Sequence, residues 1–429
     1  MTKDIINHLG ENREEYFNAA LPPIFSNSNF LFSKVEDMRE AMISKNNIPF
    51  YTRGHNPTTK IFEKKIAALE STESAIALSS GMAAISTAIL SQVKSGEHMI
   101  SVNQPYTGTD KLMKEVLPNH GIEISFIDGK NTVNFSNQIK ENTKVIYLES
   151  PNSWTYEMQD LEEISKIAKK NKLISIIDNS FSSPINCNPA KWGIDIIIHS
   201  ATKYIGGHGT SIGGIIIDSG NFDWTRNPAR QPLFNTPDPS YHGAVWGSLV
   251  PEALGAPIAY AIRARVVLLR DLGAAISPAN AFQLIQGLET LPLRYRVHQD
   301  NASRIAAHLN THANIEAVIY PGLFSGAEKA KADKYLQTGY GPIVGIELKG
   351  GEAAGRKFID NLQMIYHVAN IGDARSLAIH PASTTHSQLS AEDQLKAGVT
   401  PGYVRLSIGI EHYDDIVADI EQALAAAHA

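Results

Sequence analysis

Short apolar runs alternate with amphipathic stretches through the first two thirds of the chain. The runs are four to six residues long and lie at 75–78, 99–102, 122–127, 145–148, 173–177 and 194–198. Between them, stretches such as 161–170 carry apolar residues at helical spacing. Strands separated by helices of this length indicate parallel βαβ crossovers. We therefore expect an α/β fold with a mostly parallel, doubly wound sheet.

The pattern changes near both ends of the chain. Residues 1–55 are irregular and contain Pro22-Pro23, whereas apolar strands at 315–320, 343–348 and 404–408 indicate an α+β region. A long helix is expected over 253–272. We divide the chain into an N-terminal arm (1–55), a large domain (56–300) and a smaller C-terminal α+β domain (301–429), because 429 residues exceed one ordinary core.

The composition limits which binding partners and which cell compartment we expect. The net charge is −6 and the sequence pI is near 6.2, which argues against nucleic acid or an anionic membrane as the main partner. No apolar run approaches the roughly 18 residues of a membrane span. The start of the chain lacks the apolar core of a signal peptide. Cys187 is the single cysteine, so we expect neither a disulfide nor a cysteine-based metal site, and a cytoplasmic location.

The most informative motif is Ser200-Ala201-Thr202-Lys203, which follows the apolar run 194–198 and precedes a glycine-rich turn. A lysine amine can condense with an aldehyde, and neighbouring hydroxyls can bind a phosphate. Asp178 ends another apolar run, where a carboxylate could keep a pyridine nitrogen protonated. This combination predicts pyridoxal 5′-phosphate as the cofactor.

Three further motifs fit a phosphate-bearing aromatic cofactor. Gly81 and Met82 lie where a strand gives way to a helix, so that their amides can face a phosphate. Arg53 follows Tyr51 in an extended loop and can grip a phosphate with two hydrogen bonds. Tyr106 lies just beyond a strand end, where its flat ring can stack on a cofactor.

Together these motifs resemble the pyridoxal phosphate enzymes of cysteine and methionine metabolism, the trans-sulfuration family. The patterns YxRxxNPT, SSGMAA, the Asp-ended strand, SATK and HPAxxTH occur in the family's order from about Pro22 to Ala425. The resemblance implies an aminotransferase-like large domain of fold type I with a smaller C-terminal domain. It also implies a homo-oligomer, a dimer of dimers, whose active sites are shared between subunits.

The resemblance assigns a role to each matched residue. Lys203 would bind the cofactor aldehyde and move protons, Asp178 would pair with the pyridine nitrogen, and Tyr106 would stack on the ring. The phosphate would be held by Gly81, Met82, Ser200 and Thr202, joined by Tyr51 and Arg53 of the neighbouring subunit. Arg405 would bind the substrate carboxylate, with Ser376 as a second contact, and Asn370 and Ser153 would lie on the substrate side.

The two halves of the chain resemble different branches of the family. Asn370 and the segment between residues 218 and 264, with its PDPSYHG, look like the O-acetylhomoserine sulfhydrylases. The sequence ESPNSWTYE at 149–157 is more similar to cystathionine β-lyases, and it places Ser153 where other branches have an asparagine near the cofactor's phenolic oxygen. Residues 1–220 hold 18 Lys and 3 Arg, whereas residues 221–429 hold 6 Lys and 11 Arg. These differences suggest a chimera joined near residues 200–220.

The resemblance favours a transferase that performs γ-replacement on O-acetyl-L-homoserine. Sulfide or a thiol would displace acetate, giving L-homocysteine or a related product for methionine biosynthesis. The alternative is a β- or γ-lyase acting on cystathionine or methionine, and a third interpretation is a binding protein without turnover. The acyl group, the thiol and the choice between dimer and tetramer stay open.

Overall fold

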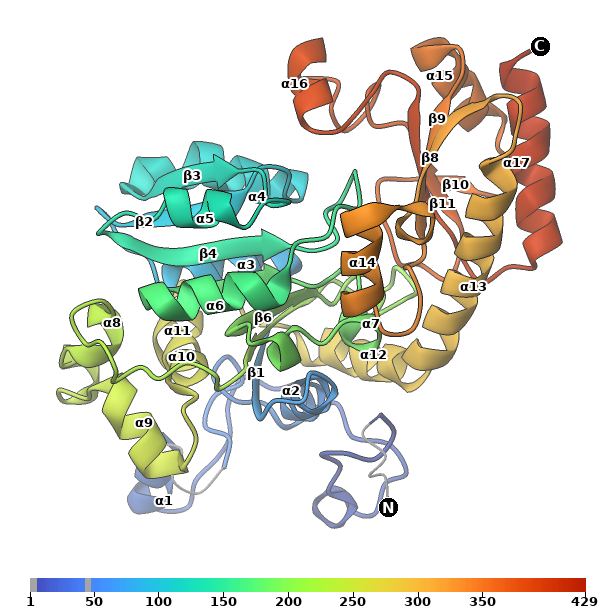
Figure 1. The fold of residues 1–429 in the computed structure, drawn as a ribbon. Coiled ribbons are helices and arrows are strands. Elements are labelled where there is room, and N and C mark those ends of the chain that lie inside the picture. Colours follow the sequence, from blue (N-terminus) through green and yellow to red (C-terminus); the bar gives the residue numbers. More distant parts are fainter. Residues whose placement is uncertain (1–5, 43–47) are drawn as a thin grey trace.

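The first of two β-sheets has seven strands with helices on both faces (Figure 1). The computed structural model describes residues 6–42 and 48–429. The strand order is β1-β7-β6-β5-β4-β2-β3, and only β7 runs antiparallel to its neighbours. The strands are β1 Ser74–Leu78, β2 His98–Val102, β3 Glu123–Ile127, β4 Thr143–Glu149, β5 Ile174–Asp178, β6 Ile196–Ser200 and β7 Gly214–Asp218. The expected α/β fold with a mostly parallel sheet is confirmed, and each of the six apolar runs forms a strand.

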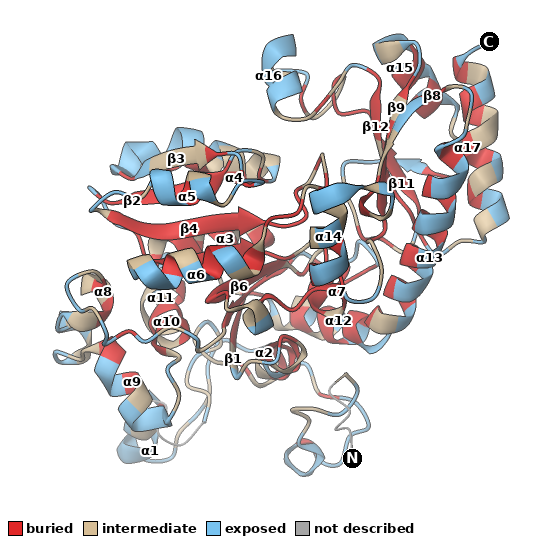
Figure 2. Cartoon of the chain, viewed as in Figure 1, coloured by how far each residue is buried: buried red, intermediate tan, exposed pale blue. Residues whose placement is uncertain are grey.

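Two apolar cores lie on opposite faces of this sheet. One contains side chains of α2, α6 and α12, and the other contains side chains of α3, α9 and α10. The helices before α13 are α1 Val35–Met42, α2 Pro57–Leu69, α3 Gly81–Leu90, α4 Thr107–Lys111, α5 Val133–Asn137, α6 Leu161–Asn171, α7 Ser183–Asn186, α8 Pro232–Asn235, α9 Trp246–Leu254, α10 Ala259–Arg263, α11 Arg270–Leu272 and α12 Pro278–Glu289. Figure 2 shows β4 buried along its length between these layers, as its continuous apolar run requires.

The helix expected over 253–272 is divided in two. α9 ends at Leu254 because Gly255 adopts the left-handed conformation, with φ of 68°, and Pro257 follows. The chain becomes helical again at Ala259 and continues through α10, a π-helical turn at Ala264–Leu269 and α11. Among the described residues no helix is long and apolar enough to cross a lipid bilayer.

The second sheet has five strands in the order β10-β11-β12-β9-β8, and all pairs except β10 with β11 are antiparallel. Its elements are β8 Ile315–Ile319, β9 Ile343–Leu348, β10 Tyr366–His367, β11 Leu377–Ile379, β12 Tyr403–Ser407, α13 Leu291–Leu309, α14 Gly326–Tyr335, α15 Gly351–Asn361, α16 Ala391–Lys396 and α17 Tyr413–Ala427. α13 places Tyr295 in the core of the first sheet and Ile305 in the core of the second. The border that we placed after residue 300 therefore falls within one helix.

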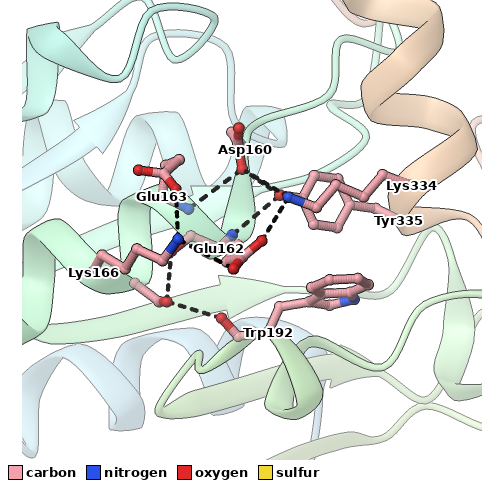
Figure 3. A network of polar contacts seen from close by, with 8 residues as sticks. Asp160, Glu162, Glu163, Lys166, Trp192, Lys334 and Tyr335 are labelled. Carbon is pink, nitrogen blue, oxygen red and sulfur yellow. Dashed lines mark hydrogen bonds and ion pairs between the residues drawn. The ribbon is translucent and has the colours of Figure 1, made fainter.

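A polar network fixes the C-terminal part against the first sheet (Figure 3). Lys334 Nζ at the end of α14 lies 2.7 Å from Glu162 Oε2 at the start of α6. The hydroxyl of Tyr335 accepts a hydrogen bond from the Glu162 amide at 3.2 Å and donates one to Asp160. These contacts help to set the distance between the two sheets, and the candidate site lies between them.

Candidate active site

The carboxyl ends of β4, β5 and β6 open into a cavity of about 240 Å³. In parallel sheets this edge is where ligands usually bind. Eight of the residues predicted from the sequence line the cavity: Gly81, Met82, Tyr106, Ser153, Asp178, Ser200, Thr202 and Lys203. The structure thus brings together residues that are more than 100 positions apart in the chain.

The start of α3 is packed tightly against Ser200. A Cβ atom at Gly81 would lie 2.6 Å from Ser200 Cβ, so only glycine fits at this position. Ser80 caps the helix by accepting a hydrogen bond from the Ala83 amide at 3.0 Å. The amides of Gly81 and Met82 have no acceptor within their own helix, because they belong to its first turn. Together with the Ser200 and Thr202 hydroxyls they form a cradle that suits a phosphate.

Asp178 lies at the end of β5 with 6% of its surface exposed. Its Oδ1 accepts a hydrogen bond from the Ser180 amide at 2.9 Å, and no cation of the described chain lies within 4.0 Å. Burial raises the pKa of Asp178. A buried carboxylate that lacks a cationic partner fits a protonated pyridine nitrogen, so the residues present suit pyridoxal phosphate.

Tyr106 stands at the entrance to α4, where its main-chain N–H donates to Glu149 Oε2 at 2.6 Å. A Cβ atom at Gly108 would lie 2.7 Å from the Tyr106 ring, so the glycine allows the ring to lie over this turn. The side chain lines the cavity, and the residue is 46% exposed. This ring can therefore stack on a flat group in the cavity.

Lys203 contacts the loop between β10 and β11 of the C-terminal part. Its Nζ donates to Asn370 Oδ1 at 2.5 Å. Burial and the positive charge of Arg405 lower the pKa of Lys203 to about 8. The loop after Asn370 lies directly against the lysine turn, because a Cβ atom at Gly372 would approach the Tyr204 amide nitrogen to 2.6 Å. A larger fraction of this amine is therefore neutral near neutral pH than for an ordinary lysine.

Arg405 lies in the middle of β12, paired with Ile379 and Gly345 of the flanking strands. Its guanidinium carbon lies 4.5 Å from the centre of the Trp154 ring. No ion pair or side-chain hydrogen bond joins it to another residue of the described ranges. An arginine held on an aromatic ring without a carboxylate partner is suited to bind the carboxylate of a ligand.

Five predicted residues are not among those that line the cavity: Asn370 and Arg405, described above, and Ser376, Tyr51 and Arg53. Ser376 is fully buried, and its hydroxyl donates to Glu411 Oε2 at 2.9 Å and accepts from the Gly409 amide at 2.9 Å. Tyr51 and Arg53 lie in an exposed loop, where the Arg53 guanidinium lies 4.9 Å from the Tyr51 ring. Their predicted place in the site of a neighbouring subunit stays a prediction.

Sequence reasoning missed Glu149 and Ser180, which both line the cavity. Glu149 ends β4 and lies opposite Asp178 of β5, and its Oε1 accepts a hydrogen bond from the Ser153 hydroxyl. The Ser180 hydroxyl accepts from the Ser200 amide at 2.5 Å. The strand-end pattern that identified Asp178 applies equally to Glu149, so a signal for this carboxyl was present in the sequence.

Known proteins resemble this chain over nearly its whole length. An O-acetyl-L-homoserine sulfhydrylase of Leptospira meyeri is 43% identical over 422 residues, which cover 97% of this chain and 95% of the relative. A homocysteine synthase of Schizosaccharomyces pombe is 41% identical over 421 residues, covering 98% and 97%.

Among solved structures, a Campylobacter jejuni protein assigned as an O-acetylhomoserine (thiol)-lyase superimposes with a TM-score of 0.93 at 38% identity, covering 98% of this chain and 99% of that one. It contains N′-pyridoxyl-lysine-5′-monophosphate at its position 205. The model of the family described as Cys/Met metabolism PLP-dependent enzyme matches residues 3–425. This chain therefore belongs to the Cys/Met metabolism PLP-dependent enzyme family.

Proposed function

We propose that this protein is a pyridoxal phosphate-dependent transferase that replaces the acetate of O-acetyl-L-homoserine with sulfide or a thiol. With sulfide the products are L-homocysteine and acetate. The observation that carries the proposal is the arrangement of Lys203, Asn370 and Arg405. Lys203 lines the cavity and donates to Asn370, and Arg405, whose charge lowers the pKa of Lys203, has no carboxylate partner in the described ranges. The full-length similarity to sulfhydrylases and homocysteine synthases supports this branch of the family.

The chain's own residues account for binding and proton movement. Gly81, Met82, Ser200 and Thr202 would hold the phosphate, and Asp178 would hold the pyridine nitrogen in its protonated form. When bound, the cofactor withdraws electrons from the bonds around the substrate's α-carbon.

Proton transfer and substrate binding involve the residues on the side of the second sheet. Lys203, with its pKa lowered to about 8, would take the α-proton and return a proton later. Arg405 would bind the substrate carboxylate with two parallel hydrogen bonds, and the Asn370 amide would orient the substrate next to the lysine.

A substrate panel analysed by mass spectrometry tests the proposal. O-acetyl-L-homoserine with sulfide should give homocysteine, whereas O-succinylhomoserine with cysteine, cystathionine and methionine should react much more slowly. In the variant K203A the rate of homocysteine formation should fall by a factor of about 10³ or more. The exposed lysine variant K349A serves as the matched control and should keep the wild-type rate. Homocysteine formation that survives in K203A would contradict the proposal.

A lyase acting on cystathionine or methionine is the second candidate. The cavity wall formed by Glu149 and Ser153 belongs to the part of the sequence that looks like cystathionine β-lyases. A lyase releases an α-keto acid and ammonia without needing sulfide. Measuring keto-acid formation with and without sulfide therefore separates the two candidates, and rapid release from cystathionine without sulfide would favour the lyase.

We further infer a homo-oligomer in which the N-terminal arm contacts another copy of the chain. Phe17 and Leu31 are fully exposed and Val35 is 79% exposed, which is unusual for such apolar side chains. A neighbouring copy would cover them and bring Tyr51 and Arg53 to its phosphate site. Measuring the molar mass of the wild type and of a Leu31→Asp variant by light scattering tests this inference. We expect the enzyme to be located in the cytoplasm.

A further inference from the structure

Two carboxyl groups lie side by side in the wall of the cavity. Glu149 and Asp178 are opposite one another on the parallel strands β4 and β5, and they are only 4% and 6% exposed. Neither has a lysine, arginine or histidine of the described chain within 4.0 Å. Two neighbouring buried carboxylates repel each other, so ionising both groups costs more free energy than ionising one.

The contacts of Glu149 show where its proton can lie. Oε2 faces the main-chain N–H of Tyr106 at 2.6 Å, and an N–H can only donate, so this oxygen has to accept. Oε1 contacts the Ser153 hydroxyl, which can accept a hydrogen bond as readily as it donates one. The Ser153 main-chain N–H also donates to this carboxyl group. A proton on Oε1 is compatible with the contacts to Tyr106 and to the Ser153 hydroxyl, and the remaining lone pairs of the carboxyl oxygens can still accept from the Ser153 N–H.

Asp178 is the better candidate for the ionised member of the pair. Burial raises the pKa of Asp178, but the hydrogen bond from the Ser180 amide and the charges of His199 and Lys203 oppose this rise. Burial and the charge of Asp178 raise the pKa of Glu149. The charge of Glu149 also acts on Tyr147 of the same strand, whose own pKa is raised by burial first and by this charge among others.

We propose that Glu149 retains a proton and donates it to Ser153, so that the Ser153 hydrogen is free to bind the ring oxygen of the cofactor. Because Ser153 accepts a hydrogen bond from Glu149, its own hydroxyl can donate to the ring oxygen. An asparagine at this position would supply such a donor without help from Glu149. Glu149 is a positioning residue, since it acts through Ser153 and Tyr106. The inference rests on the cofactor of the proposed function but not on its substrate.

The variant E149Q gives the sharpest test. A glutamine amide donates from one atom and accepts at the other, which matches the hydrogen bonds of a protonated Glu149. We compare infrared spectra of the cofactor-loaded wild type and of cofactor-loaded E149Q at neutral pH. The difference between them should contain the band of a protonated carboxyl group that the wild type has and E149Q lacks. The exposed variant E352Q on α15 is the matched control and should leave that band in place.

A pH titration of the visible absorbance of the bound cofactor provides the second readout. E149Q should keep the wild-type midpoint. S153A should raise the midpoint by roughly 0.5–1 pH unit, because the cofactor's ring oxygen loses a hydrogen-bond donor, becomes more basic and therefore holds the proton next to it more firmly. S153N should restore the midpoint. The proposal is overturned if E149Q lowers the midpoint by about one unit and the infrared band is absent from the wild type, or if S153A leaves the midpoint unchanged.

Neither readout requires turnover. If the wild type fails to convert O-acetyl-L-homoserine while these spectroscopic results are obtained, the proposed function fails and the role of Glu149 stands.

Discussion

The cavity has two sides that are built in different ways. On the cofactor side, residues from Gly81 to Lys203 lie at consecutive strand ends of one sheet and are held by main-chain contacts such as that of Gly81 with Ser200. On the other side, which we propose is the substrate side, Asn370 lies in the loop between β10 and β11, and Arg405 lies in strand β12 of the second sheet. The first side is fixed within a single sheet, whereas the second depends on how the two sheets are placed relative to each other.

Of the changes that test this comparison, a substitution of Arg405 on the substrate side should have the largest effect on activity. R405K keeps the charge but loses the two-pronged hydrogen bond, so kcat/KM for O-acetyl-L-homoserine should fall by about 10²–10³. Cofactor affinity should stay near the wild-type value, because Arg405 lies outside the phosphate cradle. Steady-state kinetics and a cofactor titration check this, with the exposed variant R356K as the control. Equal losses in both measurements would show that the two sides are not separable.

Gly81→Ala should damage the cofactor side. The new methyl group would lie 2.6 Å from Ser200 Cβ, and the forced separation of α3 from the strand ends should weaken cofactor binding by about 10–100-fold. S86A, a half-buried change in the same helix, is the control. The equilibrium constant for cofactor loading, followed by visible absorbance, provides the measurement, and unchanged loading would contradict the tight fit.

The pH dependence of cofactor capture tests how the two sides interact. Since the pKa of Lys203 is lowered to about 8, its reactive amine becomes scarcer by about tenfold for each pH unit below that value. The rate of cofactor capture by the cofactor-free protein should therefore rise up to about pH 8 and then level off. R405L removes a positive charge that lowers this pKa, so its midpoint should lie higher. Stopped-flow absorbance measures both, and identical midpoints would refute the coupling.

Ser376→Ala should have the smallest effect on catalysis. The hydroxyl is bonded to Glu411 and Gly409, so its loss should cost about 1–3 kcal/mol of folding stability and leave KM nearly unchanged. Thermal unfolding and steady-state kinetics give the two values. A large rise in KM with unchanged stability would instead support the substrate contact expected from the sequence.

The cofactor side could be predicted from the sequence because its residues follow recognisable apolar strands. Asp178, Lys203 and Gly81 each lie at such a strand end, and the structure brings them together. The placement of Ser376 could not be predicted, since its burial depends on Glu411, which is 35 positions away along the chain. Strand β7 was missed because Gly214–Asp218 follows a long glycine-rich turn and runs antiparallel to its neighbours.

The chimera hypothesis stays a prediction. The contrast between lysine and arginine usage marks the region of residues 200–220, which includes Lys203 and the start of β7. Comparing each half separately with known proteins tests it. If both halves match the same branch best, the hypothesis is wrong.

Helix α13 has a consequence for any attempt to divide the molecule. Leu291 and Tyr295 belong to the first core, and Ile305 and Leu309 belong to the second, so one continuous helix is shared by both. A fragment that begins at residue 301 would start in the middle of this helix and lack its N-terminal half. Both parts should therefore melt in a single cooperative transition, and recombinant expression of either part alone should give insoluble protein.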